Sequence, residues 1–184
     1  MQHVAFVKDN FSRAILLYSS THRTGDSNFI KNLFQETFEK YNLLNGVDPI
    51  NILSDGGSEN KGELLTWIHN IEAPPVVSKI TAQTKDFPFS NAMPDSTHSI
   101  YKTEFMHGKL SLNTLVHLQD LERFVEYYNN QRYPTKLYGY TTMEIIGGKI
   151  PDKNRFKEQI LVARKDRIQA NQQFNCSAVT SCNS

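Results

Sequence analysis

The first 80 residues alternate between short apolar runs and stretches of helical periodicity, and this alternation constrains the fold more than any other feature. Four apolar runs have the length of strands: residues 4–7, 14–18, 50–53 and 76–80. Two stretches between them carry apolar residues at helical spacing: residues 29–41 and 64–71. Strands that alternate with helices predict an α/β domain in which helices cover a sheet.

The pattern changes after residue 80, where helical signals dominate. The first two apolar runs are separated by the turn pair Asp9-Asn10, which predicts a β-hairpin. Four later stretches have the spacing of helices: residues 94–107, 114–130, 141–146 and 152–173. The sequence therefore predicts an α/β layer with helical additions towards the C-terminus.

Composition excludes several classes of protein. Lys and Arg number 20 against 19 Asp and Glu, so the formal net charge is +1 and any basic surface must come from local clustering. No apolar run approaches the roughly 18 residues of a membrane span, and the N-terminus lacks the pattern of a signal peptide. Both cysteines, Cys176 and Cys182, lie in a polar tail, which argues against a disulfide framework. We expect a soluble cytoplasmic protein without a membrane partner.

Asp55 is the first candidate for a functional residue. It follows the apolar run 50–53 and precedes Gly56-Gly57-Ser58. Ligand sites in open α/β sheets gather at the carboxyl ends of strands, and a carboxylate there suits a hard cation. The same residues also fit an ordinary Asp-Gly turn, and from this feature alone the turn is favoured at about two chances in three.

Asp95 and Lys102 form the second candidate pair. Asp95 lies near the start of a predicted helix, where the helix dipole favours a negative charge, and Lys102 follows two turns later. An acid and a base so spaced could hold a metal ion and a phosphate. Taken alone, a helix-capping acid and an unrelated solvated lysine are the better interpretation.

A basic helix is predicted over residues 149–173. This stretch holds seven Lys and Arg against three Asp and Glu, which gives a local charge of +4. Arg164, Lys165 and Arg167 are clustered within it and could follow the phosphates of DNA. A solvated helix face explains the same charges about equally well.

Several short segments, in order along the chain, resemble the catalytic core of the DDE integrases and transposases, of the retroviral-integrase-like type found in bacterial insertion sequences. They are VAFVKDNFSR at 4–13, ILSDGGSE at 52–59, FSNAM at 89–93 with Asp95 and Lys102, YYNNQR at 127–132, and LYGYTTME at 137–144. The resemblance extends over roughly residues 4–148.

The resemblance implies an RNase-H-like fold, a mixed sheet flanked by helices, over residues 1–148. The basic helix 149–173 and a frayed polar tail 174–184 would follow it. The resemblance also implies three carboxylates that hold two Mg²⁺ or Mn²⁺ ions for phosphoryl transfer on DNA. Asp55 matches the second acid of the family, and Asp95 takes the place of the third, which is normally Glu. Lys102 matches a DNA-contacting lysine, and we expect Asn91 to contact DNA as well.

Two departures from the family pattern matter. The first acid of the family lies on a strand before the hairpin, at the centre of the sheet, and this sequence starts at the hairpin. Asp9 belongs to the hairpin turn and is not that acid. Without the central strand, the hairpin and the strand that ends at Asp55 each keep an unpaired edge. Asp95 is also one methylene shorter than Glu, so its carboxylate reaches less far.

We therefore expect a degenerate transposase core that does not catalyse strand transfer alone. One alternative is a non-catalytic DNA-binding or regulatory fragment that uses the basic helix, and another is a metal-dependent nuclease of RNase-H type that uses Asp55 and Asp95. The expected partners are DNA and either further copies of the chain or a full-length transposase. The expected location is the cytoplasm, in association with the nucleoid.

Overall fold

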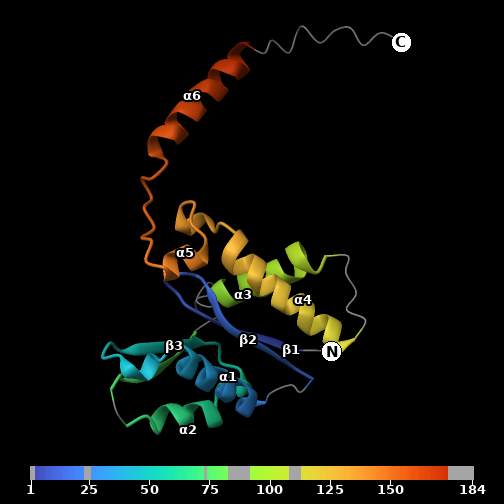
Figure 1. Ribbon diagram of the computed structural model, residues 1–184, viewed down its shortest axis with the longest axis vertical. Helices are drawn as coiled ribbons and strands as arrows, with labels where there is room; N and C mark the ends of the chain where they lie inside the picture. Colours follow the sequence, from blue (N-terminus) through green and yellow to red (C-terminus); the bar gives the residue numbers. More distant parts are fainter. Residues whose placement is uncertain (1–2, 23–25, 73, 83–91, 108–112, 174–184) are drawn as a thin grey trace.

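The computed structural model describes residues 3–22, 26–72, 74–82, 92–107 and 113–173. It shows a mixed α/β protein with two small sheets and helices packed around them (Figure 1). None of the described helices is both long enough and apolar enough to cross a membrane.

The first sheet is the predicted hairpin. β1 (His3–Lys8) pairs antiparallel with β2 (Ile15–Thr21), and the register changes between Val7 and Lys8. The turn that joins them is held by Asp9, whose carboxylate accepts hydrogen bonds from the backbone N–H groups of Phe11 and Ser12 at 3.3 and 2.7 Å. The turn therefore owes its shape to a local side chain, as the Asp9-Asn10 pair predicted.

The second sheet is parallel. β3 (Ile50–Ser54) pairs with β4 (Val77–Thr81). The crossover between them passes through a short 3₁₀ turn (Ser58–Asn60) and α2 (Glu63–His69), and α1 (Ser27–Lys40) packs against α2. A small apolar core joins these elements through the side chains of Phe38, Ile52, Leu64 and Ile68.

The four described strands form two separate sheets of two strands each, with the unpaired edges that were expected where the central strand of the family sheet is missing. Among the described residues, β1 pairs with β2 alone and β3 pairs with β4 alone. No strand of the described chain lies between β1 and β3 to connect them. The two edges therefore lack the partner that would merge the sheets.

The helices after residue 91 cover the hairpin. α3 (Ala92–Ile100) continues as a π-helical turn (Tyr101–Phe105), and α4 (Thr114–Glu126) continues as a second one (Tyr127–Gln131). Together with the hairpin they bury a core of aromatic and aliphatic side chains: Ile15, Tyr101, Leu121, Phe124 and Tyr128. The predicted helices 94–107 and 114–130 thus exist, but each ends in a π turn that the 3.6-residue period does not indicate.

Short elements complete the chain. They are the 3₁₀ turns Leu43–Asn45 and Thr135–Leu137 and the helix α5 (Thr142–Ile146), which begins with a capping box between Thr141 and Glu144. α6 (Lys157–Gln173) leads away from the packed body and has no buried residue (Figure 1). It begins five residues later than predicted because Asp152 forms a turn, in which its carboxylate accepts a hydrogen bond from the backbone N–H of Asn154 at 2.8 Å. The predicted tail 174–184 lies outside the described residues.

Candidate functional site

Asp55 lies directly after β3, in the loop that enters the 3₁₀ turn. Its Oδ1 atom accepts hydrogen bonds from the backbone N–H of Gly57 at 3.0 Å and from the side-chain amide of Asn60 at 2.6 Å. Both hydrogen bonds recorded for this carboxylate go to Oδ1. Asp55 therefore organises the Asp-Gly turn, as the simpler interpretation of the sequence required, and still presents a second oxygen.

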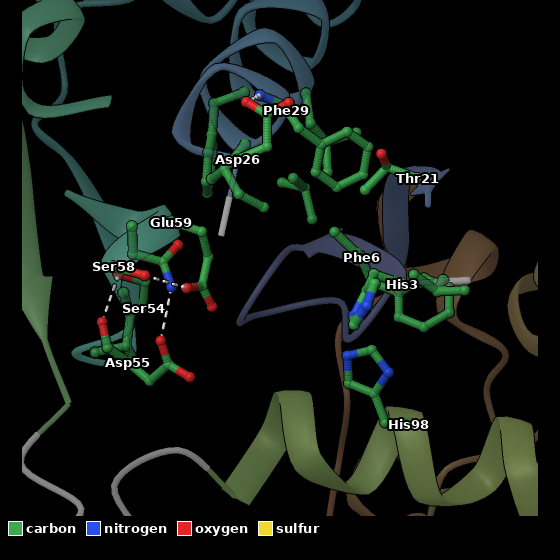
Figure 2. Close-up of a pocket in the computed structure, with 18 residues that line it drawn as sticks. His3, Phe6, Thr21, Asp26, Phe29, Ser54, Asp55, Ser58, Glu59 and His98 are labelled. Atoms are coloured by element: carbon green, nitrogen blue, oxygen red, sulfur yellow. Dashed lines mark hydrogen bonds between the residues drawn. The ribbon is translucent and has the colours of Figure 1, made fainter. Parts of the chain in front are cut away.

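A pocket of about 650 Å³ lies next to Asp55 (Figure 2). β1 borders it along residues 3–7, and the carboxyl end of β3 borders it on the other side. Apolar residues of α1 close a third side, with Phe29 and Leu33 among them, and His98 of α3 closes the fourth. The pocket thus lies between the two sheets and between two helices.

Three carboxylates are among the residues that line this pocket. Asp26 caps the start of α1, where its Oδ1 accepts hydrogen bonds from two backbone N–H groups, and α1 packs against the turn that holds Glu59. Asp26, Asp55 and Glu59 all line the pocket, and none of its described lining residues is Lys or Arg. The Asp and Glu side chains of the described lining therefore have no Lys or Arg beside them in that lining, and many of the remaining lining residues are apolar.

Asp95 and Lys102 lie on the helix that closes the pocket, but neither lines it. Both are exposed, Asp95 in the first turn of α3 and Lys102 in the π turn. Both charges act on the imidazole of His98. Burial lowers the pKa of this imidazole, the positive charge of Lys102 lowers it further, and the negative charge of Asp95 opposes the shift. The predicted spacing therefore places the acid and the lysine on one side of the helix, around a histidine that the sequence did not single out.

The acids predicted to hold metal ions do not form a metal-binding group among the described residues. The described residues contain no group of three His, Cys, Asp or Glu side chains that could hold a metal ion. Asp55 offers one suitable oxygen, Asp26 is used as a helix cap, and Asp95 lies outside the pocket lining. The described residues do not by themselves form the two-ion site that the resemblance implies.

The predicted DNA-binding residues are widely separated. Arg164, Lys165 and Arg167 are exposed on α6, which leads away from the pocket (Figure 1). Lys102 is exposed in the π turn that follows α3, and Asn91 lies outside the described residues. The structure does not bring these groups together into one basic surface.

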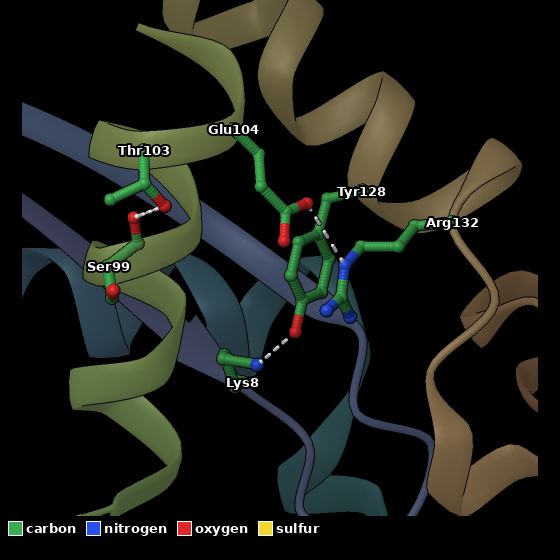
Figure 3. A network of polar contacts seen from close by, with 6 residues as sticks. All are labelled: Lys8, Ser99, Thr103, Glu104, Tyr128 and Arg132. Carbon is green, nitrogen blue, oxygen red and sulfur yellow. Dashed lines mark hydrogen bonds and ion pairs between the residues drawn. The ribbon is translucent and has the colours of Figure 1, made fainter. Parts of the chain in front are cut away.

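A polar network around Lys8 was not expected from the sequence (Figure 3). Its ammonium donates hydrogen bonds to the hydroxyl of Thr97 at 2.7 Å and to the phenol oxygen of Tyr128 at 2.6 Å. Burial, with the positive charges of Arg13 and Arg132 added, lowers the pKa of Lys8 from 10.5 to about 7. Arg132 also contacts Glu104 at 3.7 Å. The network ties β1 to α3 and to the second π turn.

Asn129 forms a second contact that the sequence did not reveal. Its buried side chain accepts a hydrogen bond from the backbone N–H of Ile15 at 3.0 Å and donates one to the carbonyl of the same residue at 2.9 Å. The hydroxyl of Thr142 donates to the Asn129 backbone carbonyl at 3.0 Å. An amide side chain thus pairs with the start of β2 as a neighbouring strand would. The only signal in the sequence is the Tyr-Tyr-Asn-Asn segment itself.

No protein-family model and no curated protein sequence matches the chain.

Proposed function

We propose that the chain is a DNA-recombination core of the integrase and transposase type that binds DNA and does not cut or join it alone. The observation that carries the proposal is the position of Asp55, at the carboxyl end of β3 and facing a pocket that α3 also borders. Carboxylates at such strand ends are the usual ligands of catalytic cations in α/β proteins.

The packing of the resembling segments supports the proposal. The hairpin segment 4–13 contacts the segment 127–132 through Lys8 and Tyr128, and β2 contacts it through Asn129. The last segment, 137–144, joins the same cluster through Thr142. Three of the five segments that resemble the family therefore pack together, which is the expected result if their likeness reflects a shared RNase-H-like fold.

The absence of a complete carboxylate group among the described residues favours an inactive core. Two-metal phosphoryl transfer needs several oxygen ligands around a pair of ions, and Asp55 supplies one in this pocket. Asp95 lies in the first turn of α3, outside the pocket lining, and has a shorter side chain than the Glu of the family. DNA binding does not need these ligands, so it can persist where catalysis fails.

Non-catalytic DNA binding is the second candidate function, and α6 favours it. Every residue of this helix is exposed, so Arg164, Lys165 and Arg167 are all available to phosphates. Neutralising three phosphates would change the slope of log affinity against log salt by about 2–3.

Two assays on one labelled DNA duplex test both candidates. We expect salt-dependent binding, with a slope that falls by about 2–3 in the Arg164→Ala, Lys165→Ala, Arg167→Ala triple variant. Substituting Gln169 and Gln172 by Ala on the same helix is the matched control and should leave the slope unchanged.

The same duplex is then incubated with Mg²⁺ or Mn²⁺ and assayed for nicking and strand transfer. We expect no product from a chain whose fold is confirmed by circular dichroism. Product that disappears in Asp55→Asn or Asp95→Asn would contradict the inactive core and support a nuclease or recombinase. Absence of both cutting and binding would reject the proposal as a whole.

A further inference from the structure

We infer that Lys8, Arg13 and Arg132 form a binding site for the phosphate group of a phosphate monoester or of inorganic phosphate. The observations that support this site are side-chain contacts, backbone geometry and a charge balance around the phenol ring of Tyr128. None of them involves Asp55 or its pocket, so the site is independent of the proposed function.

Two cationic side chains meet at the ring of Tyr128. The ammonium of Lys8 lies 4.7 Å from the ring centroid and donates a hydrogen bond to the phenol oxygen at 2.6 Å. The guanidinium carbon of Arg132 lies 5.3 Å from the same centroid (Figure 3). Arg13 is close enough that its charge, like that of Arg132, lowers the pKa of Lys8. Three positive charges therefore share one small region, and the side chain of Arg132 is 24% exposed there.

The backbone is irregular at three places in this cluster. The hairpin register shifts between Val7 and Lys8, Arg13 has a left-handed φ of 66°, and Tyr128 lies in a π-helical turn. Bulges and π turns occur frequently at functional sites. The left-handed region is uncommon for residues other than Gly, Asn and Asp. An arginine is therefore kept at a turn position where a small residue would be less strained.

The charges of the cluster do not balance. The carboxylate that forms an ion pair with it is Glu104, which contacts Nε of Arg132 at 3.7 Å and is 47% exposed. When Lys8 is protonated, three positive charges less one negative charge leave +2. A phosphate monoester has a charge of about −1.5 to −2 at pH 7, whereas each phosphodiester of a nucleic acid has about −1. The dianion of a monoester therefore matches the cluster better than a diester does.

The cluster also has hydrogen-bond donors for an oxyanion. Lys8 directs two of its three N–H groups to Thr97 and Tyr128. Glu104 contacts Arg132 at Nε, and among the described residues the two terminal nitrogens of this guanidinium have no hydrogen-bond partner. The planar guanidinium fork fits two oxygens of a phosphate group. One N–H of Lys8 and the fork of Arg132 can therefore hold three oxygens of one ligand.

The first test is calorimetric titration of the full chain with inorganic phosphate at pH 7, which should show saturable binding to one site. Dimethyl phosphate, a diester with one charge, should bind about tenfold or more weakly because it offers fewer acceptor oxygens. A folded chain, as judged by circular dichroism, that shows no saturable phosphate binding would overturn the inference, whether or not it binds duplex DNA. Equal binding of the diester would overturn it as well.

Substitutions locate the binding within the cluster. Lys8→Met and Arg132→Gln should each weaken phosphate binding by about tenfold or more, because each removes a hydrogen bond from a charged donor. Arg13→Gln, which removes a charge, should weaken it by about two- to fivefold. Lys61→Met and Arg123→Gln, at exposed positions elsewhere, are the matched controls and should leave it unchanged. Unchanged binding in both Lys8→Met and Arg132→Gln would contradict the site.

The dependence on pH gives a readout that a purely structural lysine would not change. Sulfate is the probe, because it keeps two charges from pH 7 to pH 9. Burial raises the pKa of Tyr128 above 10.0 and lowers that of His98, which also faces Lys8, below 6.5. Lys8, with a pKa of about 7, therefore titrates in this range while its arginine neighbours stay charged. Sulfate affinity should fall by about fivefold or more from pH 7 to pH 9 in the unmodified chain. It should stay constant in Lys8→Met, and equal pH dependence in the two chains would contradict the site.

A last comparison distinguishes the two carriers of the phosphate group. A trinucleotide with a 5′-phosphate and the same trinucleotide with a 5′-hydroxyl are titrated into the full chain. Tighter binding of the phosphorylated form, lost in Arg132→Gln, would support the site and assign it to the end of a nucleic acid. Equal binding of the two forms, with inorganic phosphate bound, would support the site and assign it to free phosphate.

Discussion

The buried lysine of the hairpin makes the sharpest prediction about stability. Lys8 lies among Thr97, Tyr128 and Arg132, and burial together with neighbouring positive charges lowers its pKa to about 7. In the unfolded chain its pKa is the ordinary 10.5. We therefore expect the free energy of unfolding to depend on pH through this one residue.

The direction of the effect follows from the protons bound in each state. Below about pH 7 both states carry the proton, and the folded state bears the full cost of a buried charge. Between about 7 and 10.5 the folded Lys8 is neutral and the unfolded one is charged, so the folded state binds fewer protons and stability rises with pH. Each pKa unit is worth about 1.4 kcal/mol, and integration from pH 7 to pH 9 gives a gain of about 2 kcal/mol.

The assay compares the unmodified chain with Lys8→Met by urea denaturation at several pH values between about 6 and 9, followed by far-ultraviolet circular dichroism. The difference in unfolding free energy between the two chains should shift by about 2 kcal/mol in favour of the unmodified chain from pH 7 to pH 9. Lys61→Met, at an exposed position after the 3₁₀ turn, is the matched control and should show no such shift. A difference between Lys8→Met and the unmodified chain that stays constant with pH would refute the reasoning.

Three further predictions concern the helical half of the molecule and use the same denaturation assay. Asn129→Ala leaves a buried N–H and a buried carbonyl of β2 without partners, so it should lower the free energy of unfolding by about 2–4 kcal/mol. Asn130→Ala, at an exposed position, should lower it by less than about 0.5 kcal/mol. Similar values for the two variants would contradict the pairing. Phe124→Ala should cost about 3–5 kcal/mol because the ring is fully buried, and Leu115→Ala, 72% exposed on the same helix, should cost under about 0.5. Thr141→Ala removes the capping box of α5 and should cost about 1 kcal/mol; an unchanged stability would show that this helix is held by packing alone.

The secondary structure was largely predictable because its signals are local. The four apolar runs became the four strands, and the helical stripes became α1 to α5 with shifts of a few residues at their ends. The turn at Asp9 and the turn at Asp55 were also readable, since each depends on a carboxylate that bonds to backbone N–H groups two or three residues ahead. The start of α6 was misplaced because a similar turn at Asp152 competes with the first helical turn.

The candidate site was predictable only in part. Asp55 was chosen from its place after a strand, and the structure puts it beside a pocket. The relation of Asp95 to that pocket depends on where α3 lies in space, and its spacing along the helix alone could not give this. Lys8 and Asn129 carried no local signal, because their partners lie 120 and 114 residues away.

The sequence by itself determined where the strands, helices and turns of this protein form, because hydrophobic period and turn chemistry act over a few residues. It also determined the local charge of α6. Only the tertiary structure decided that a pocket lies between the two sheets, that three acids are among its lining residues, and that Lys8 has a lowered pKa. These properties depend on strand pairing and on burial by distant elements, and no short stretch of sequence contains them.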